Sequence, residues 1–132
     1  MPSNHGQLYA NVSQSDPLAF WANHGLNYKR VRDFLDFDTN ALSKLSGVSK
    51  KSVRFDSGIP RDLKDRLVQI ANICNLVAEY FNGDSEKTAL WFNTINPMLG
   101  DITPRDMIRL GRYKKLLKFV TQARSEKATT NT

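Results

Sequence analysis

The sequence predicts an all-α protein of 132 residues, and three observations support this fold class. Apolar residues recur at spacings of three and four over most of the chain, which is the period of a helix that buries one face. The alternation of apolar and polar residues that is typical of strands is missing, so we expect no strand. Segments with the helical period begin after Ser, Thr, Asp or Pro and end at Gly or Asn, as helices do.

The two ends of the chain differ from the middle. Residues 1–17 are polar and show no sustained period, so we expect a mobile arm or a loosely docked lead-in. We take residues 1–26 as the N-terminal arm and the equally polar residues 125–132 as a flexible tail. The predicted helices lie between these two segments.

The first two predicted helices are short. One covers residues 27–35, where apolar side chains gather on one face and basic ones lie elsewhere. The next begins at a cap, Asp38 or Thr39, and ends at Ser46. Gly47 fits the left-handed backbone position just past a helix end.

A short third helix and the longest helix follow. Ser49 can cap a helix over residues 50–55, and Gly58 interrupts the chain after it. We expect the longest helix over residues 60–81, with Asp62 in the first turn, where the helix dipole favours an acid. Its apolar stripe is broad and comprises Leu63, Leu67, Ile70, Ile73, Cys74, Leu76, Val77, Tyr80 and Phe81. Such a stripe needs cover on two sides, from the preceding helices and from either the C-terminal part or a second chain.

Three more helices are expected in the C-terminal part. Residues 86–94 form the first of them. Thr103, followed by a proline and then Asp106, is a helix-start signal of the capping-box kind, and Gly111 ends that short helix. The last helix covers residues 113–124. Its outward side chains are basic: Lys114, Lys115, Lys118 and Arg124.

Length and charge bound the possible functions. A chain of this size with 40% apolar residues suits one domain or two small helical units with a shared core, here residues 27–82 and 83–124. The net charge of +6 is uneven, because residues 27–66 carry ten basic and six acidic side chains and residues 104–132 carry eight and two. Either basic zone suits a polyanionic partner.

Catalytic, metal and membrane functions are not expected. Cys74 is the one cysteine and lies on the apolar stripe, where burial raises a thiol pKa and makes a poor nucleophile. His5 and His24 lack a ligand cluster, and glycine-rich nucleotide-binding motifs are missing, so we expect no metal, no cofactor and no enzyme. The sequence has neither an apolar run of membrane-spanning length nor a signal-peptide layout, so we expect a cytoplasmic protein.

The stretch ALSKLSGVSKK, residues 41–51, has the features of a helix-turn-helix motif. In this motif two helices cross steeply through a short turn, and the second lies in the DNA major groove. Ser43 is the small residue needed where the helices pack, Gly47 tolerates positive φ, and Val48 is the apolar plug of the turn. We expect the wedge between the helices to consist of Leu42, Leu45, Val48 and Val53.

The residues left exposed at the front of the second helix suit DNA. They are Ser49, Lys50, Lys51, Ser52 and Arg54. Lysine and arginine bind phosphates or guanine acceptors, and serine hydroxyls bond to either. We therefore predict that these five residues bind double-stranded operator DNA. The alternative is an ordinary helical hairpin with solvated lysines.

The segment ALSKLSGVSKKSVRFDSGIP, residues 41–60, resembles the helix-turn-helix of Xre-type regulators. In those proteins a leucine, a small residue, a glycine-valine-serine turn and an acidic-glycine-proline run follow in this order. Ser43 stands where they usually carry alanine. The run from Val53 to Gly58 is one residue shorter than theirs.

The segment ALWFNTINPMLGDITPRDMIRLGRYKKLLKFV, residues 89–120, resembles the toxin-binding domain of MbcA/ParS/Xre antitoxins. The matching positions are Trp91, Asn96, Pro97, Leu99, Gly100, Thr103, Pro104, Asp106, Met107, Ile108 and Gly111. Asp101 stands where that family commonly has a second glycine, and Arg112 where it has a small or acidic residue.

Together the resemblance covers about residues 27–122 and implies an antitoxin of a type II toxin-antitoxin pair. Proteins of this family bind DNA at their own promoter as dimers or larger assemblies. They also hold a RES-domain toxin that consumes NAD, and they cover its active-site entrance. The resemblance thus implies a RES-domain toxin as partner, in a homodimer or a toxin-antitoxin hetero-oligomer.

A basic rim on the C-terminal unit suits an acidic partner, because charge pairing aids encounter and selectivity. We predict that the rim binds the toxin through Arg105, Arg109, Arg112 and Lys115. The alternative for these residues is a solvated basic face. Two other functions fit the sequence: a solitary helix-turn-helix transcriptional regulator whose C-terminal half mediates dimerisation, and a protein-binding adaptor without DNA binding.

Overall fold

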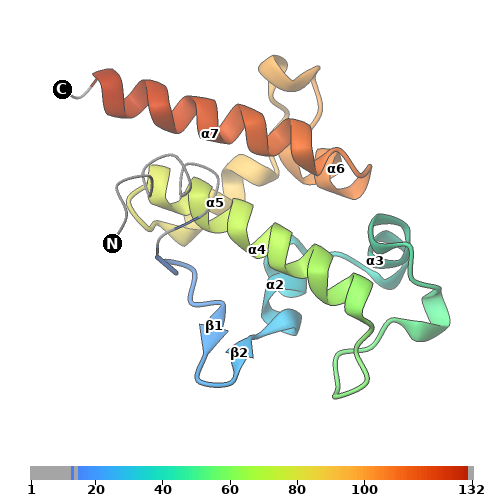
Figure 1. Cartoon of the computed structure of the whole chain (residues 1–132). Coiled ribbons are helices and arrows are strands. Elements are labelled where there is room, and N and C mark those ends of the chain that lie inside the picture. Colours follow the sequence, from blue (N-terminus) through green and yellow to red (C-terminus); the bar gives the residue numbers. More distant parts are fainter. Residues whose placement is uncertain (1–12, 14, 131–132) are drawn as a thin grey trace.

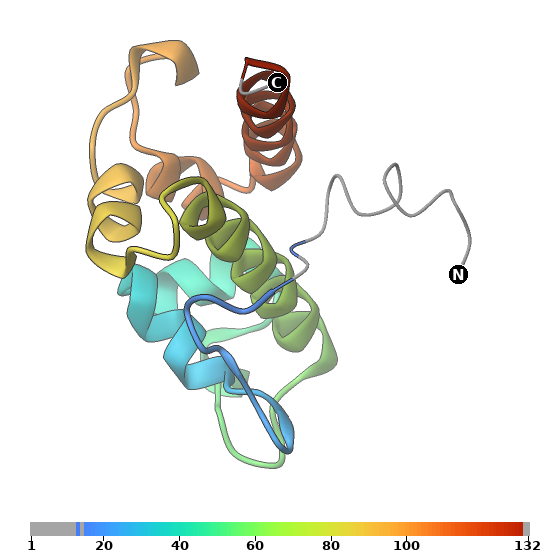
Figure 2. The ribbon, with the colours of Figure 1, turned by 90° about the vertical axis from the view of Figure 1, so that its left-hand side faces the viewer.

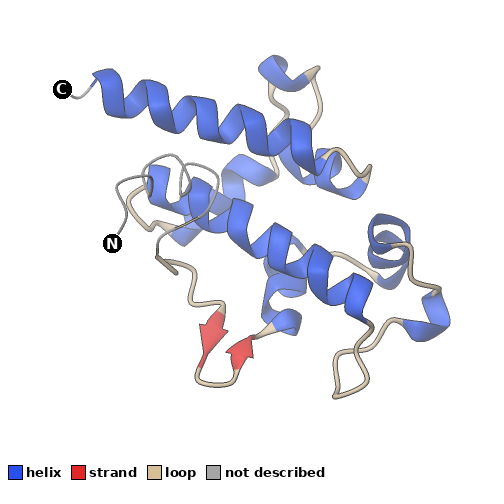
Figure 3. Cartoon of the chain, in the orientation of Figure 1, coloured by secondary structure: helices blue, strands red, loops and turns tan. Residues whose placement is uncertain are grey.

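The computed structural model of the chain describes Ser13 and residues 15–130 (Figure 1). The rest of the predicted arm, with His5, and the last two residues of the predicted tail lie outside the described residues. The chain is mostly helical, as the sequence predicts (Figure 3). The described elements are β1 (Trp21–Ala22), β2 (Gly25–Leu26), α2 (Tyr28–Leu35), α3 (Thr39–Ser46), the 3-10 turn η2 (Lys50–Ser52), α4 (Arg61–Tyr80), α5 (Ser85–Phe92), the 3-10 turn η3 (Pro97–Leu99), α6 (Pro104–Arg109) and α7 (Tyr113–Thr130).

Helix α4 is the centre of the fold. All six consecutive residues from Ile73 to Ala78 are buried, so this part of the helix is covered on every side. Helices α2 and α3 pack against α4 from the preceding part of the chain, and α5 and α7 pack from the following part (Figure 1). The predicted cover on two sides is confirmed, and the second cover comes from the C-terminal helices of the same chain.

The two predicted helical units share one hydrophobic core. Helix α3 contacts α6, and α2 contacts α5, so the units meet beside α4 as well as through it. Buried residues from both units belong to one cluster, among them Val31 and Leu42 from the first and Phe92, Met107 and Leu116 from the second. The relative position of the N-terminal and C-terminal surfaces is therefore fixed by packing.

One expectation for the N-terminal segment is wrong. A short antiparallel hairpin forms where no strand was expected, with Trp21 paired to Leu26. Strands of two residues are too short to show an alternating pattern, and the hairpin needs Gly25, which has a φ of 109°. Leu18 and Phe20, which follow the residues expected to be mobile or loosely docked, are buried in the core.

Hydrogen bonds made by Asn75 and Asp16, which we call the polar bracket, hold this segment on α4. The fully buried Asn75 accepts a hydrogen bond from the Leu18 N–H at 3.1 Å and donates one to the Asp16 carboxylate at 2.9 Å. Asp16 also accepts from the backbone N–H groups of Phe20, at 2.9 Å, and Trp21, at 2.8 Å. Burial acts to raise the pKa of Asp16, but these hydrogen bonds, together with a nearby arginine, lower it below its usual 3.8.

The last helix is longer than predicted. Helix α7 continues to Thr130 instead of ending near Arg124, so the predicted flexible tail is helical in its described part. Two contacts with α4 hold it there. Arg124 donates to the Glu79 carboxylate at 2.8 Å, and Lys127 donates to the carbonyl of Tyr80 at 2.7 Å with its ammonium 4.3 Å from the ring centre. Contacts between distant segments of this kind leave no periodic signal in the sequence.

Replacing Asp16 tests the polar bracket. The lowered pKa means that the ionised carboxylate stabilises the folded state above the unfolded pKa, and that this contribution is lost as the pH falls through the folded pKa. We expect Asp16→Asn to reduce the free energy of unfolding by about 1 kcal/mol at neutral pH. The difference from the parent chain should shrink below about pH 4, as urea unfolding at several pH values would measure. Equal losses at all pH values would contradict this account.

Candidate functional site

Gly47 turns the chain sharply at the end of α3. Its φ is 78°, in the left-handed region, and its N–H donates to the carbonyl of Ser43 at 2.9 Å. The Ser43 hydroxyl donates to the carbonyl of Val48 at 2.6 Å, and the Val48 N–H donates to the Ser46 hydroxyl at 3.2 Å. The left-handed backbone position that the sequence predicts for Gly47 is confirmed, and we call the turn at this glycine the elbow. Ser43, which departs from the resembled family, forms a hydrogen bond across it.

The second helix of the predicted motif is largely absent. The structure has only the 3-10 turn η2 after the elbow, and the backbone is already extended at Val53. Val53 and Phe55, two residues apart, both pack against the core. An extended chain places such residues on one side, whereas a helix does not. Ser49 also makes no helix cap, because its hydroxyl bonds to the hydroxyl of Ser52 at 3.0 Å.

The five predicted DNA-binding residues are divided by this change. Ser49, Lys50, Lys51 and Ser52 lie together and exposed on the turn that follows the elbow, which we call the basic tip. Among the described residues neither lysine of the tip takes part in an ion pair. Arg54 is not part of the tip, because it is paired with Asp56 in the loop that follows. The basic tip therefore offers two available ammonium groups and two hydroxyls that are bonded to each other.

Arg54 is bound within its own loop. Its guanidinium donates two hydrogen bonds of 2.6 Å to the carboxylate of Asp56, which also accepts the N–H of Gly58 at 2.9 Å. The hydrogen bond from Arg54 lowers the pKa of Asp56. A Cβ atom at Gly58 would lie 3.0 Å from the guanidinium carbon, so the glycine leaves room for this pair. A nucleic acid would have to compete with Asp56 for Arg54.

Arg105 of the predicted toxin-binding rim holds two helices of this chain together. It donates to the carbonyls of Leu35, at 2.5 Å, and Asp36, at 2.8 Å, both at the C-terminal end of α2. Its guanidinium also lies 4.9 Å from the ring centre of Phe37. These contacts satisfy helix-end carbonyls and fix α6 against α2. They leave Arg105 less free for a partner than the sequence suggests.

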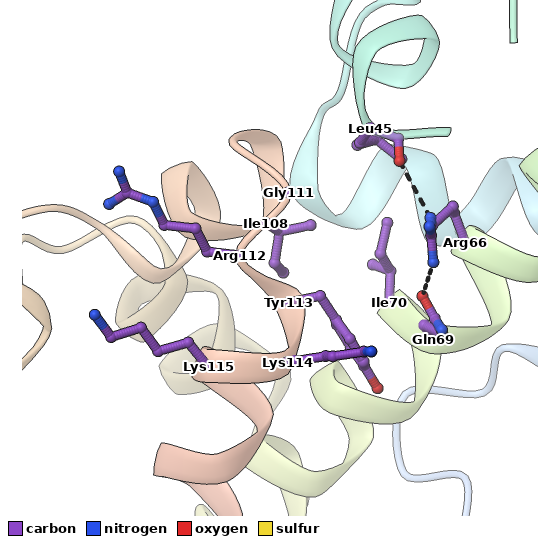
Figure 4. Close-up of a pocket in the computed structure, with 10 residues that line it drawn as sticks. All are labelled: Leu45, Arg66, Gln69, Ile70, Ile108, Gly111, Arg112, Tyr113, Lys114 and Lys115. Carbon is purple, nitrogen blue, oxygen red and sulfur yellow. Dashed lines mark hydrogen bonds between the residues drawn. The ribbon is translucent and has the colours of Figure 1, made fainter. Parts of the chain in front are cut away.

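The other three rim residues differ in exposure and pairing. Arg109 pairs with Asp106 on its own helix, with the two groups 3.1 Å apart. Arg112 and Lys115 are exposed and line a pocket of about 360 Å³ together with Arg66 and Lys114 (Figure 4). Two of the four residues predicted for the toxin-binding rim, Arg112 and Lys115, therefore lie beside Arg66 and Lys114, which were not predicted to belong to it. Arg66 comes from α4, so no local pattern connects it with the others.

An exposed apolar surface on the C-terminal unit was also missed. It comprises Leu90, Ile95 and Met98, which are 68%, 62% and 77% exposed, and we call it the apolar surface. It spans the end of α5 and a loop that projects from the helices (Figure 2). The side chain of Asn96 accepts a hydrogen bond from the Met98 N–H at 3.0 Å, and the backbone N–H of Asn96 donates to the carbonyl of Ile102 at 3.0 Å. These two hydrogen bonds hold the loop in shape. The sequence does contain one signal for this surface, because residues 89–99 hold more apolar side chains than one face of a helix can bury.

The chemistry of the remaining reactive groups is limited. Cys74 is fully buried in α4, and burial raises the pKa of its thiol. Among the described residues no three or more His, Cys, Asp or Glu side chains gather as a metal site. Within the same part of the chain, no helix combines the length and the apolar character needed to cross a membrane.

Substitution of Gly47 tests whether the elbow depends on its positive φ. A Cβ atom there would meet no atom within 4 Å, so backbone strain alone should decide the effect. We expect Gly47→Ala to reduce the free energy of unfolding by about 1 kcal/mol, and Gly47→Asn to reduce it less, because asparagine tolerates the left-handed region. Thermal or urea unfolding would measure both. Equal losses in the two variants would argue against a strained backbone.

Comparison of this chain with protein-family models, with curated proteins and with solved structures finds no match.

Proposed function

We propose that this chain is an antitoxin that binds duplex DNA at its own promoter and neutralises a RES-type toxin that consumes NAD. One observation supports this function most directly. A single packed core carries two exposed surfaces of different chemistry, the basic tip and the apolar surface. A protein that controls transcription in response to a protein partner needs one surface for each.

The basic tip is suited to DNA by its position and its charge. Gly47 directs the chain outward, and Lys50 and Lys51 follow it with no carboxylate paired to them among the described residues. Ammonium groups of this kind bind phosphates, and the hydroxyls of Ser49 and Ser52 can bond to phosphate or base edges. A single 3-10 turn cannot lie along a groove as an α-helix does. We therefore infer that the tip acts mainly through phosphate contacts.

The apolar surface is suited to a protein partner. Contiguous exposed apolar patches commonly mark interaction sites, and Leu90, Ile95 and Met98, all more than half exposed, lie within nine residues of the chain. Methionine and aliphatic side chains form the dry centre of protein interfaces, where charged residues are depleted. The loop that presents Met98 also contains Asn96, Pro97 and Leu99, which carry the resemblance to the toxin-binding domain. This coincidence supports the toxin as the occupant.

A second copy of the chain is the other candidate occupant. In that case the protein is a solitary regulator, and the apolar surface joins two subunits so that two basic tips meet the duplex. The two functions differ in a simple way. An antitoxin should co-purify with a RES-domain toxin encoded beside it and should rescue growth, whereas a solitary regulator should dimerise through the apolar surface without such a partner.

A charge-removal variant tests the basic tip. We expect Lys50→Ala with Lys51→Ala to weaken binding to any duplex and to reduce the slope of log affinity against log salt by roughly one unit for each phosphate that is no longer neutralised. Fluorescence anisotropy over a range of salt concentrations would measure both. Lys87→Ala, at an exposed position on α5, is the control and should change neither. An unaltered slope in the double variant would exclude the basic tip from the DNA interface.

Charged substitutions test the apolar surface. We expect Ile95→Asp with Met98→Asp to abolish co-purification of a co-expressed RES-domain toxin and to abolish growth rescue, because each change places a charge in the dry centre of the interface. Helix content and DNA affinity should not change, since both side chains are exposed in the free chain. Gln122→Asp, on the exposed part of α7, is the control. Retention of the toxin by the double variant would rule out this surface as its docking site.

A further inference from the structure

A basic pocket lies where the two helical units meet. Its wall includes Leu45 at the end of α3, Arg66 and Ile70 on α4, and Ile108 and Tyr113 from the C-terminal unit (Figure 4). The pocket has a volume of about 360 Å³ and an apolar floor. Leu45 precedes Gly47 by two residues, so the pocket borders the elbow that carries the basic tip.

The cations of this pocket come from distant parts of the chain. They are Arg66, Arg112, Lys114 and Lys115. From here on the basic rim means these four residues, which share only Arg112 and Lys115 with the rim predicted to bind the toxin. The residues that line the pocket include no carboxylate. Among the described residues none of the four takes part in an ion pair, although Arg66 donates to the carbonyl of Leu45 at 3.2 Å and to the side chain of Gln69 at 2.9 Å. The rim therefore carries positive charge that the rest of the described chain does not neutralise.

The turn at Gly111 positions three of the four rim cations. Gly111 has a φ of 80°, and the chain turns there from α6 into α7. Arg112, Lys114 and Lys115 consequently lie in and just before the first turn of an 18-residue helix, whose dipole adds positive potential at the same edge. In Figure 4 the charged ends of Arg112 and Lys115 extend away from Ile70 and Ile108, outward from the apolar floor.

We propose that the basic rim is a second phosphate-binding surface, which contacts the DNA backbone beside the place where the basic tip meets the duplex. This inference rests on the proposed DNA binding and adds residues from the C-terminal unit to it. A one-turn tip with two lysines makes few phosphate contacts, whereas specific DNA binding commonly involves several. The rim supplies four more cations, and packing holds the backbone that carries them beside the elbow, because α7 contacts α4 and α6 contacts α3.

The composition of the rim favours DNA over a protein partner. Its two lysines belong to a residue type that is depleted in protein interfaces, and all four cations can neutralise phosphates. The outward direction of Arg112 and Lys115 also fits an extended backbone better than a small phosphate compound enclosed in the pocket (Figure 4). The apolar surface, by contrast, has the composition of a protein interface and lies on other elements. The two partners thus bind different parts of the C-terminal unit.

The test compares two double variants of the full chain. The rim variant combines Lys114→Gln and Lys115→Gln. The control variant combines Lys87→Gln and Lys118→Gln, which remove the same charge outside the rim. Binding to the promoter duplex and to an unrelated duplex would be measured over a range of salt concentrations. We expect the rim variant to lose affinity equally for both duplexes, on the order of 10-fold or more at physiological salt, with the salt slope reduced by about one to two units. The control should keep the parent slope.

Three outcomes would overturn this inference, and they are distinguishable. Equal salt slopes in the rim and control variants would show that the rim does not touch DNA, while the proposed function stands. Loss of toxin co-purification with unchanged DNA affinity would assign the rim to the protein partner. Failure of the parent chain to bind any duplex would remove the DNA-binding function itself and the rim contact with it. Circular dichroism of each variant would verify that the fold is retained.

Discussion

The burial of residues 73–78 of α4 on every side is the constraint on which the rest of the structure depends. No single neighbour covers a helix all round, so segments from both ends of the chain must pack against it. Helices α2 and α3 cover part of it, and α5 and α7 cover another part. Asn75 lies within the buried stretch, and its amide needs polar partners there, which the N-terminal segment supplies through Leu18 and Asp16. The buried amide is thus one of the interactions that hold the N-terminal segment on α4, beside the burial of Leu18 and Phe20.

The structure also separates charges that are used internally from charges that remain available. The ion pairs among the described residues are made by arginines, including Arg54, Arg109 and Arg124, and Arg105 binds the end of α2. A planar guanidinium with several donors suits such fixed contacts. The exposed cations of the basic tip are both lysines. Those of the basic rim include two more lysines and Arg112, at the turn before α7. Net charge alone does not reveal this division.

The proposed surfaces follow from how the core is closed. The elbow at Gly47 and the turn at Gly111 both end helices that pack on each other, α3 and α6, so their exposed basic residues are held near one junction. The loop with Ile95 and Met98 belongs to a different edge, where it projects from the helices (Figure 2) and the Asn96 hydrogen bonds hold its shape. A DNA-binding antitoxin would use this separation to hold two partners at once.

The sequence by itself determined most of the helices, the caps at Asp38 and Thr103 and the elbow at Gly47, because these depend on neighbours within a few residues. The period of three and four, Gly47, the Thr103 cap, whose hydroxyl accepts the Asp106 N–H at 3.0 Å, and the burial of Cys74 are all of this kind. Only the tertiary structure decided the extended chain after η2, the roles of Arg54 and Arg105, the length of α7 and the grouping of Arg66 with the C-terminal lysines. Each of these results from contacts between side chains and backbone whose partners are chosen by packing, and packing leaves no local pattern in the sequence.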